Sequence, residues 1–297
     1  MLDAIKALYG SAVAEDLNSI IDPESYHWFK TESGMPFGLK KAAVSEKEYR
    51  LLTLTFQPLT TLPKSLTDEE RIWHECLFLG KKNHEVFSDG TSRYLLHIQL
   101  KSTLSDPDAF REAIQALFDQ TPVILWKNEE TVILVLLNRP DAILAEEFIQ
   151  ILATDFYADV RLFIGTALNG ADSAHALYTL EEKAFALARK VLPEKRIYVF
   201  EKVLPLVMLT EVPKEIMETA YGSLFQVLKD GDPEWVKSLS TFFEHGLNMK
   251  QAAKALFIHR NSLQYRLDKF TERTGLDPRQ FDEALFIYLG LLAEKLL

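Results

Sequence analysis

The polar side chains of this sequence that are best suited to recognition chemistry lie close together near its carboxyl end. Arg260, Asn261, Gln264 and Tyr265 all carry groups that can hydrogen-bond to the edges of nucleic acid bases. Asparagine and glutamine can pair bidentately with adenine, and arginine can pair in the same way with guanine. We therefore expect these four side chains to read bases in a duplex groove.

A second set of side chains surrounds them and can donate hydrogen bonds to phosphate. It consists of Lys250, Lys254, His259, Ser262, Arg266 and Lys269. Contacts with phosphate set the register and orientation of a protein on a duplex without reading its sequence. We expect these six residues to contact the DNA backbone.

Two short helices must position these groups. At 100° per residue, one side of the first helix is apolar and the second carries a matching apolar stripe. These positions are Met249, Ala252, Ala253 and Leu256 in the first helix, and Leu263, Leu267 and Phe270 in the second. Asn248 is a capping residue for the first helix, and the second runs from about Arg260 to Thr274 and ends at Gly275. The pattern predicts a helix-turn-helix in which residues 260–274 form the recognition helix, although an alanine-rich helix pair can also be a purely structural hairpin.

Several spaced residues in this region coincide with a known family. The matching residues are Ala252-Ala253, Leu256, the run from Ile258 to Leu263, Tyr265-Arg266-Leu267 and the run from Thr274 to Asp277. From about Glu234 to its end, the chain resembles the C-terminal domain of the PucR family, which includes the carbohydrate diacid regulators. This resemblance implies a sequence-specific DNA-binding transcriptional regulator that is not an enzyme. Phe257 stands where many helix-turn-helices have glycine.

Alternating strand and helix patterns precede this region and give the order β-α-β-β-α-β followed by α-β. The expected ranges are 94–100, 107–118, 123–126, 131–137, 142–155, 160–164, 173–191 and 196–200. This order predicts a ferredoxin-like domain, so the fold class is α+β multidomain with an all-α C-terminal domain. The expected domains are residues 1–85, mostly helical and of unknown function, residues 86–212 and residues 213–297, with Thr60 to Ser65 as a linker.

The resemblance also covers the central domain, which looks like the degenerate diguanylate-cyclase-like domain of the family. The hairpin from Trp126 to Thr131 has no glycine, and the strand from Leu95 to Leu100 has no acid. Without these groups neither phosphate nor magnesium has an obvious binding place, so we expect no catalysis and no cofactor. The alternative is a nucleotide cyclase-like or phosphoryl-transfer enzyme with a helical interaction tail.

Charge is unevenly distributed along the chain. The net charge of the whole chain is −10, whereas residues 248–275 contain six lysines and arginines against two acids. A local excess of positive charge is what binding to double-stranded DNA requires. One helix reads only a few base pairs, so we also expect a homodimer. We further expect a small-molecule effector of unknown identity.

The remaining composition indicates a cytoplasmic protein with no membrane partner. The N-terminus has no secretory signal pattern, and no apolar run is long enough to predict a membrane span with assurance. Cys76 is the single cysteine and cannot form an internal disulfide. Trp73-His74-Glu75-Cys76 places potential ligands in a row, but adjacent helical side chains diverge, so we expect no metal site.

Overall fold

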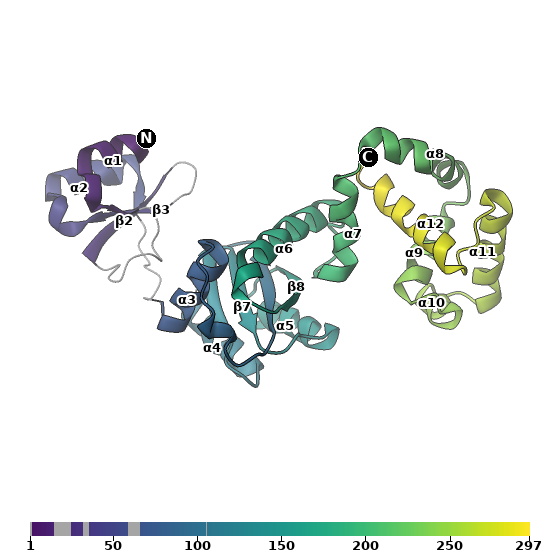
Figure 1. Cartoon of the computed structure of the whole chain (residues 1–297), viewed down its shortest axis with the longest axis horizontal. Coiled ribbons are helices and arrows are strands. Elements are labelled where there is room, and N and C mark those ends of the chain that lie inside the picture. The colour runs from purple at the N-terminus through teal and green to yellow at the C-terminus, as the bar shows by residue number, and fades with distance from the viewer. Residues whose placement is uncertain (1, 15–24, 32–35, 59–65, 105) are drawn as a thin grey trace. The chain divides into compact units, whose positions relative to one another are not determined.

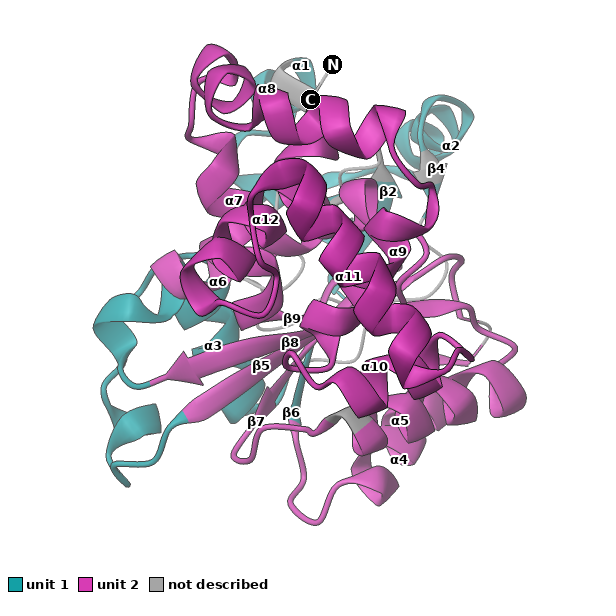
Figure 2. Ribbon diagram, turned by 90° about the vertical axis from the view of Figure 1, so that its right-hand side faces the viewer, with its two compact units in different colours: residues 1–92, 123–125, 169–175 teal, residues 93–122, 126–168, 176–297 magenta. Residues whose placement is uncertain are grey.

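A computed structural model of the chain describes residues 2–14, 25–31, 36–58, 66–104 and 106–297. The described residues form two compact units, shown in Figure 2. One consists of residues 1–92 with 123–125 and 169–175, and the other of residues 93–122, 126–168 and 176–297. The linker predicted from Thr60 to Ser65 lies outside the described residues.

The N-terminal unit contains helices and a small antiparallel sheet. Its helices are α1 (Leu2–Tyr9), α2 (Glu46–Thr55) and α3 (Asp68–Phe78), with short 3₁₀ turns at Gly10–Ala12, Lys41–Ala43 and Glu85–Phe87. Its strands are β1 (Val13–Ala14), β2 (Tyr26–Lys30), β3 (Pro36–Lys40) and β4 (Gln57–Pro58), in the sheet order β1-β3-β2-β4. Phe29, Phe37 and Leu39 are completely buried in its core.

This sheet adds strands that the sequence analysis did not expect within residues 1–85, next to the helices that it did expect. Trp28 of β2 lies opposite Gly38 of β3, and a Cβ atom on Gly38 would be only 3.0 Å from the indole ring. The pairing depends on contact between strands of five residues each, and so short a strand carries too few positions for a clear alternating pattern.

The central part of the chain follows the expected succession of elements around a five-stranded mixed sheet (Figure 1). In chain order these are β5 (Arg93–Leu100), α4 (Pro107–Leu117), β6 (Val123–Asn128), β7 (Thr131–Leu136), α5 (Ala142–Asp155), β8 (Val160–Leu168), α6 (Ala171–Val191) and β9 (Ile197–Val199). The strand order is β6-β7-β5-β8-β9. Strand β5 is antiparallel to β7 and β8, and β8 is parallel to β9.

A buried polar pair joins this sheet to α6. His97 of β5 and Glu181 of α6 are 1% and 0% exposed, with 2.8 Å between His97 Nε2 and Glu181 Oε2. The other carboxylate oxygen accepts a hydrogen bond from the Thr166 amide at 2.8 Å. Gly165 leaves room for this carboxylate, because a Cβ atom there would lie 2.5 Å from its oxygens.

The C-terminal part is helical throughout. It contains α7 (Phe200–Thr210), α8 (Lys214–Asp230), α9 (Glu234–Glu244), α10 (Met249–Ala255), α11 (Arg260–Thr274) and α12 (Phe281–Glu294). Phe200, expected at the end of a strand, instead begins α7, a helix that the sequence reading missed. The last helix, α12, begins at Phe281.

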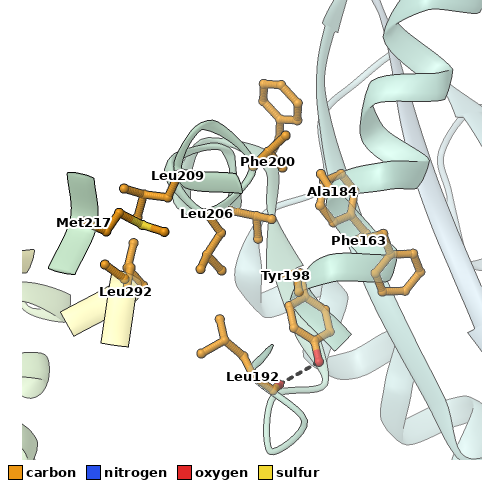
Figure 3. Close-up of a cluster of buried hydrophobic side chains, with 14 residues drawn as sticks. Phe163, Ala184, Leu192, Tyr198, Phe200, Leu206, Leu209, Met217 and Leu292 are labelled. Carbon is orange, nitrogen blue, oxygen red and sulfur yellow. Dashed lines mark hydrogen bonds between the residues drawn. The ribbon is translucent and has the colours of Figure 1, made fainter. Parts of the chain in front are cut away.

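One apolar cluster packs the sheet against helices α7, α8 and α12 (Figure 3). Phe163 of β8 and Tyr198 of β9 lie in it together with Leu206, Met217 and Leu292 from the three helices. The Tyr198 hydroxyl donates a hydrogen bond to the Leu192 carbonyl at 2.9 Å, drawn as the dashed line in Figure 3. The end of α12 is thereby fixed to the same core as the sheet.

Candidate nucleic-acid interface

The helix pair α10 and α11 rests on an apolar core of its own. Leu263, Leu267 and Phe270 of α11 are at most 1% exposed, and Ala252 and Ala253 of α10 face the same cluster. Helices α8, α9 and α12 complete this core, with Trp235 meeting the Phe270 ring edge-on at 5.7 Å between ring centres. Because α11 is held by this apolar underside, its polar side faces outward.

Both ends of the two helices are defined by local hydrogen bonds. The Asn248 side chain accepts from the amides of Lys250 and Gln251 at 3.1 Å, as expected for a capping residue. His259 caps α11, because its Nδ1 accepts from the Asn261 amide at 3.2 Å. Gly275 ends α11 in the left-handed conformation with φ of 74°.

The turn between α10 and α11 contains Phe257 in the left-handed conformation, with φ of 56°. Its side chain is 96% exposed, so no packing within the described chain compensates for the unfavourable backbone. Ile258 follows it, packs at the edge of the core and donates its amide to the Ala253 carbonyl at 3.0 Å. The turn therefore has the expected position, with a phenylalanine in a glycine-type conformation.

The four predicted base-reading residues lie on the solvent side of α11. Arg260, Asn261 and Tyr265 are exposed, and Gln264 is half-buried. The Gln264 amide nitrogen donates to both carboxylate oxygens of Asp268, at 3.1 and 3.2 Å. The structure thus places all four on one helix, with Gln264 already engaged by a neighbour.

The residues predicted to contact phosphate differ in whether another side chain of the protein already engages them. Lys250 and Lys254 on α10 are exposed, and no ion pair within the described chain engages either of them, whereas Lys269 forms an ion pair with Glu272 at 2.6 Å. The hydrogen bond with Glu272 raises the pKa of Lys269, and the Lys269 ammonium also lies 5.8 Å from the centre of the Tyr265 ring. Ser262 is exposed in the first turn of α11.

Arg266 is engaged by side chains of α9. Its Nη1 is 3.2 Å from Glu234 Oε2 and 3.1 Å from Ser238 Oγ, and Ser238 is fully buried in α9. The guanidinium therefore ties α11 to α9. The phosphate contact predicted for Arg266 stays a prediction, and this geometry lends it no support.

Arg279 is a residue that the sequence reading missed. It follows α11 and forms an ion pair with Asp268 at 2.7 Å, next to the Gln264 amide. No local pattern indicates this contact, because Arg279 lies beyond the end of the helix and reaches back over eleven positions.

Neither a metal cluster nor a membrane span was found in the part of the chain that the structure describes. Those residues contain no group of three or more His, Cys, Asp or Glu that could hold a metal ion. No described helix combines the length and the apolar character that crossing a membrane requires.

Comparison with known proteins finds a family model that matches the helix pair. The family model for the PucR C-terminal helix-turn-helix domain matches residues 235–293, from α9 through most of α12. Residues 235–293 are therefore similar to a PucR-type helix-turn-helix. The matched range contains the four predicted base-reading residues and the whole of α10 and α11.

The chain is similar to one protein along its whole length and to two regulators over part of its length. The uncharacterized protein YxkF of Bacillus subtilis is 29% identical over 99% of both chains. The carbohydrate diacid regulator of Escherichia coli is 28% identical over 46% of this chain and 36% of its own length. The proline-responsive transcriptional activator PutR of Bacillus subtilis is 34% identical over 23% of this chain and 16% of its own length.

Proposed function

We propose that the chain is a sequence-specific DNA-binding transcriptional regulator of the PucR type. In this proposal α11 enters the major groove, with Arg260, Asn261, Gln264 and Tyr265 at base edges. Phosphate contacts come from Lys250, Lys254, His259, Ser262 and Lys269, while Arg266 holds α11 on α9.

One observation carries the proposal. Within the residues that match the PucR-type helix-turn-helix, α11 buries Leu263, Leu267 and Phe270 completely and leaves Arg260, Asn261 and Tyr265 in solvent. A helix with this division can lie in a groove without disturbing its own core. The names of the diacid regulator and of PutR agree with a role in regulation.

The sheet-containing part is proposed to be a non-catalytic, ferredoxin-like and degenerate cyclase-like domain. Its strand order β6-β7-β5-β8 is the order that a βαββαβ succession of the ferredoxin-like kind gives. We further propose a cytoplasmic homodimer on a two-fold DNA site, because one recognition helix contacts too few base pairs for useful affinity. A small-molecule effector acting through the N-terminal parts belongs to the same proposal.

The experiment is selection of bound duplexes from a random pool by the full chain, followed by affinity measurements on the selected duplex. Asn261→Ala and Arg260→Ala should each weaken discrimination among bases by about tenfold. Lys229→Ala on α8 removes an exposed charge in the same domain outside the helix pair and should leave discrimination unchanged. A wild-type chain that enriches no sequence, even at low salt, would contradict the proposal.

No observation favours the alternative of a cyclase-like or phosphoryl-transfer enzyme. In the β6–β7 hairpin, the Asn128 side chain accepts from the Glu130 amide, so this turn is closed by its own residues. His97, in the middle of β5, is buried and paired with Glu181. Incubation with nucleoside triphosphates and magnesium should therefore release no product.

A further inference from the structure

A series of hydrogen-bonded side chains beside the base-reading residues sets the orientation of the Gln264 amide. The Gln264 Nε2 atom donates to Asp268 Oδ1 at 3.1 Å and to Oδ2 at 3.2 Å. Asp268 is one turn further along α11, at the i,i+4 position where side chains meet. The contact therefore forms within the helix and does not depend on DNA.

The carboxylate of Asp268 sets which end of the Gln264 amide faces it. An ionised carboxylate can only accept hydrogen bonds, whereas an amide has a donating nitrogen and an accepting oxygen. Rotating the Gln264 amide by 180° would replace two hydrogen bonds with oxygen facing oxygen. The Gln264 Oε1 atom is thus directed away from Asp268, and it has no donor among the described residues.

Arg279 holds Asp268 in place. Its Nη1 donates to Asp268 Oδ1 at 2.7 Å, and its Nε donates to Asp277 Oδ1 at 2.6 Å. Asp277 in turn donates its amide to Glu283 of α12. These contacts continue from Gln264 to the start of the last helix, so Asp268, which accepts from the Gln264 amide, is itself held through Arg279 and Asp277.

We propose that Asp268 and Arg279 are positioning residues that make Gln264 present its carbonyl oxygen to the major groove, where it reads the exocyclic amino group of adenine or cytosine. This rests on the proposed function. The amino groups N6 of adenine and N4 of cytosine are the hydrogen-bond donors of the major groove, whereas N7, O6 and O4 accept. A freely rotating glutamine could bond to either kind, but the oriented one meets an accepting atom with its own oxygen.

The first step of the test finds the base pair that Gln264 reads. Wild type and Gln264→Ala are compared by selection from a random duplex pool, and the position that loses its preference is identified. At that position the amino group is then deleted, with purine in place of adenine or 2-pyrimidinone in place of cytosine. Deletion on one strand should weaken wild-type binding about tenfold and Gln264→Ala binding less than twofold.

The second step tests the positioning role with a double-mutant cycle. Asp268→Ala should lose about tenfold discrimination at the same base pair, and adding it to Gln264→Ala should cause no further loss. Asp268→Asn keeps the side-chain volume but can turn either end toward Gln264, so it should broaden the same position alone. Glu218→Ala is the control, since it removes an exposed carboxylate that pairs with Lys214 on α8, outside the helix pair, and it should leave discrimination unchanged.

Three results would overturn the proposal. They are tolerance of amino-group deletion by the wild type, equal weakening of all duplexes by the Asp268 variants, and additive effects of Gln264→Ala and Asp268→Ala. Each of these can arise while the wild type still selects a sequence. Absence of any selected sequence would instead contradict the proposed function itself, so the two failures are distinguishable.

Discussion

Phe257 offers a sharp test of how the turn between α10 and α11 is built. Its φ of 56° belongs to the left-handed region, which costs an ordinary residue about 1–2 kcal/mol relative to its preferred backbone. Because 96% of the side chain is exposed, removing the ring eliminates almost no buried surface. The backbone strain and the side-chain packing can therefore be separated by two substitutions.

Phe257→Gly removes the strain but adds backbone freedom to the unfolded chain, which costs about 0.5–1 kcal/mol. Phe257→Ala keeps the strain and removes only the ring, so its free energy of unfolding should lie within about 0.5 kcal/mol of wild type. The difference between the two effects makes the glycine variant more stable than the alanine variant by about 1 kcal/mol.

The measurement is hydrogen exchange of the amides in residues 249–274 of the full chain, at several urea concentrations. This reports the opening of the helix pair itself, separately from the rest of the chain. An alanine variant as stable as the glycine variant would refute the strain argument. A loss of 2 kcal/mol or more in the alanine variant would show that the ring is covered in solution.

Further predictions concern binding, the buried pair and acid stability. Lys254→Ala should reduce the slope of log affinity against log salt by about one, while Lys229→Ala should leave it unchanged; equal slopes for wild type and Lys254→Ala would show that Lys254 contacts no phosphate. Gly165→Ala should displace Glu181 from His97 and lower the free energy of unfolding by roughly 3 kcal/mol in urea titrations, because it leaves buried polar groups without their hydrogen bonds. An unchanged unfolding midpoint would contradict this. Burial alone would raise the pKa of Asp277, but the hydrogen bonds from Arg279 outweigh it and lower that pKa. The ionised Asp277 side chain therefore stabilises the fold above its unfolded pKa of about 3.9, and this stabilisation is lost as the pH falls through the lower folded pKa. The difference in unfolding midpoint between wild type and Asp277→Asn should accordingly shrink between about pH 5 and pH 3.

The elements around the candidate site could be read from the sequence because their signals are local. The cap at Asn248, the apolar positions of α11 and the ending at Gly275 all lie within or next to the helices they define. The expected range of α11, residues 260–274, agrees with the structure for this reason. The same applies to Asp106, which accepts from the amides of Asp108 and Ala109 at the start of α4.

What the sequence reading missed depends on contacts between distant residues. The N-terminal sheet is formed by strands of two to five residues, whose patterns are too short to read. The partners of Arg266 and Arg279 are 32 and 11 positions away, so neither helical spacing nor residue type shows which charges they neutralise. The sequence shows that Arg266 can pair with an anionic group, but it does not show that this group lies on α9.

The last helix belongs to two apolar clusters. Ile287 and Leu291 pack beneath the helix-turn-helix, and Leu292 and Ala293 pack with Phe163 and Tyr198 of the sheet. Chimeras that exchange the DNA-reading end between relatives should therefore move α7 and the strands it covers together with α12. A junction placed just before α8 would pack the end of α12 from one protein against the sheet of another. The resulting mismatch would disturb the helix-turn-helix through α12.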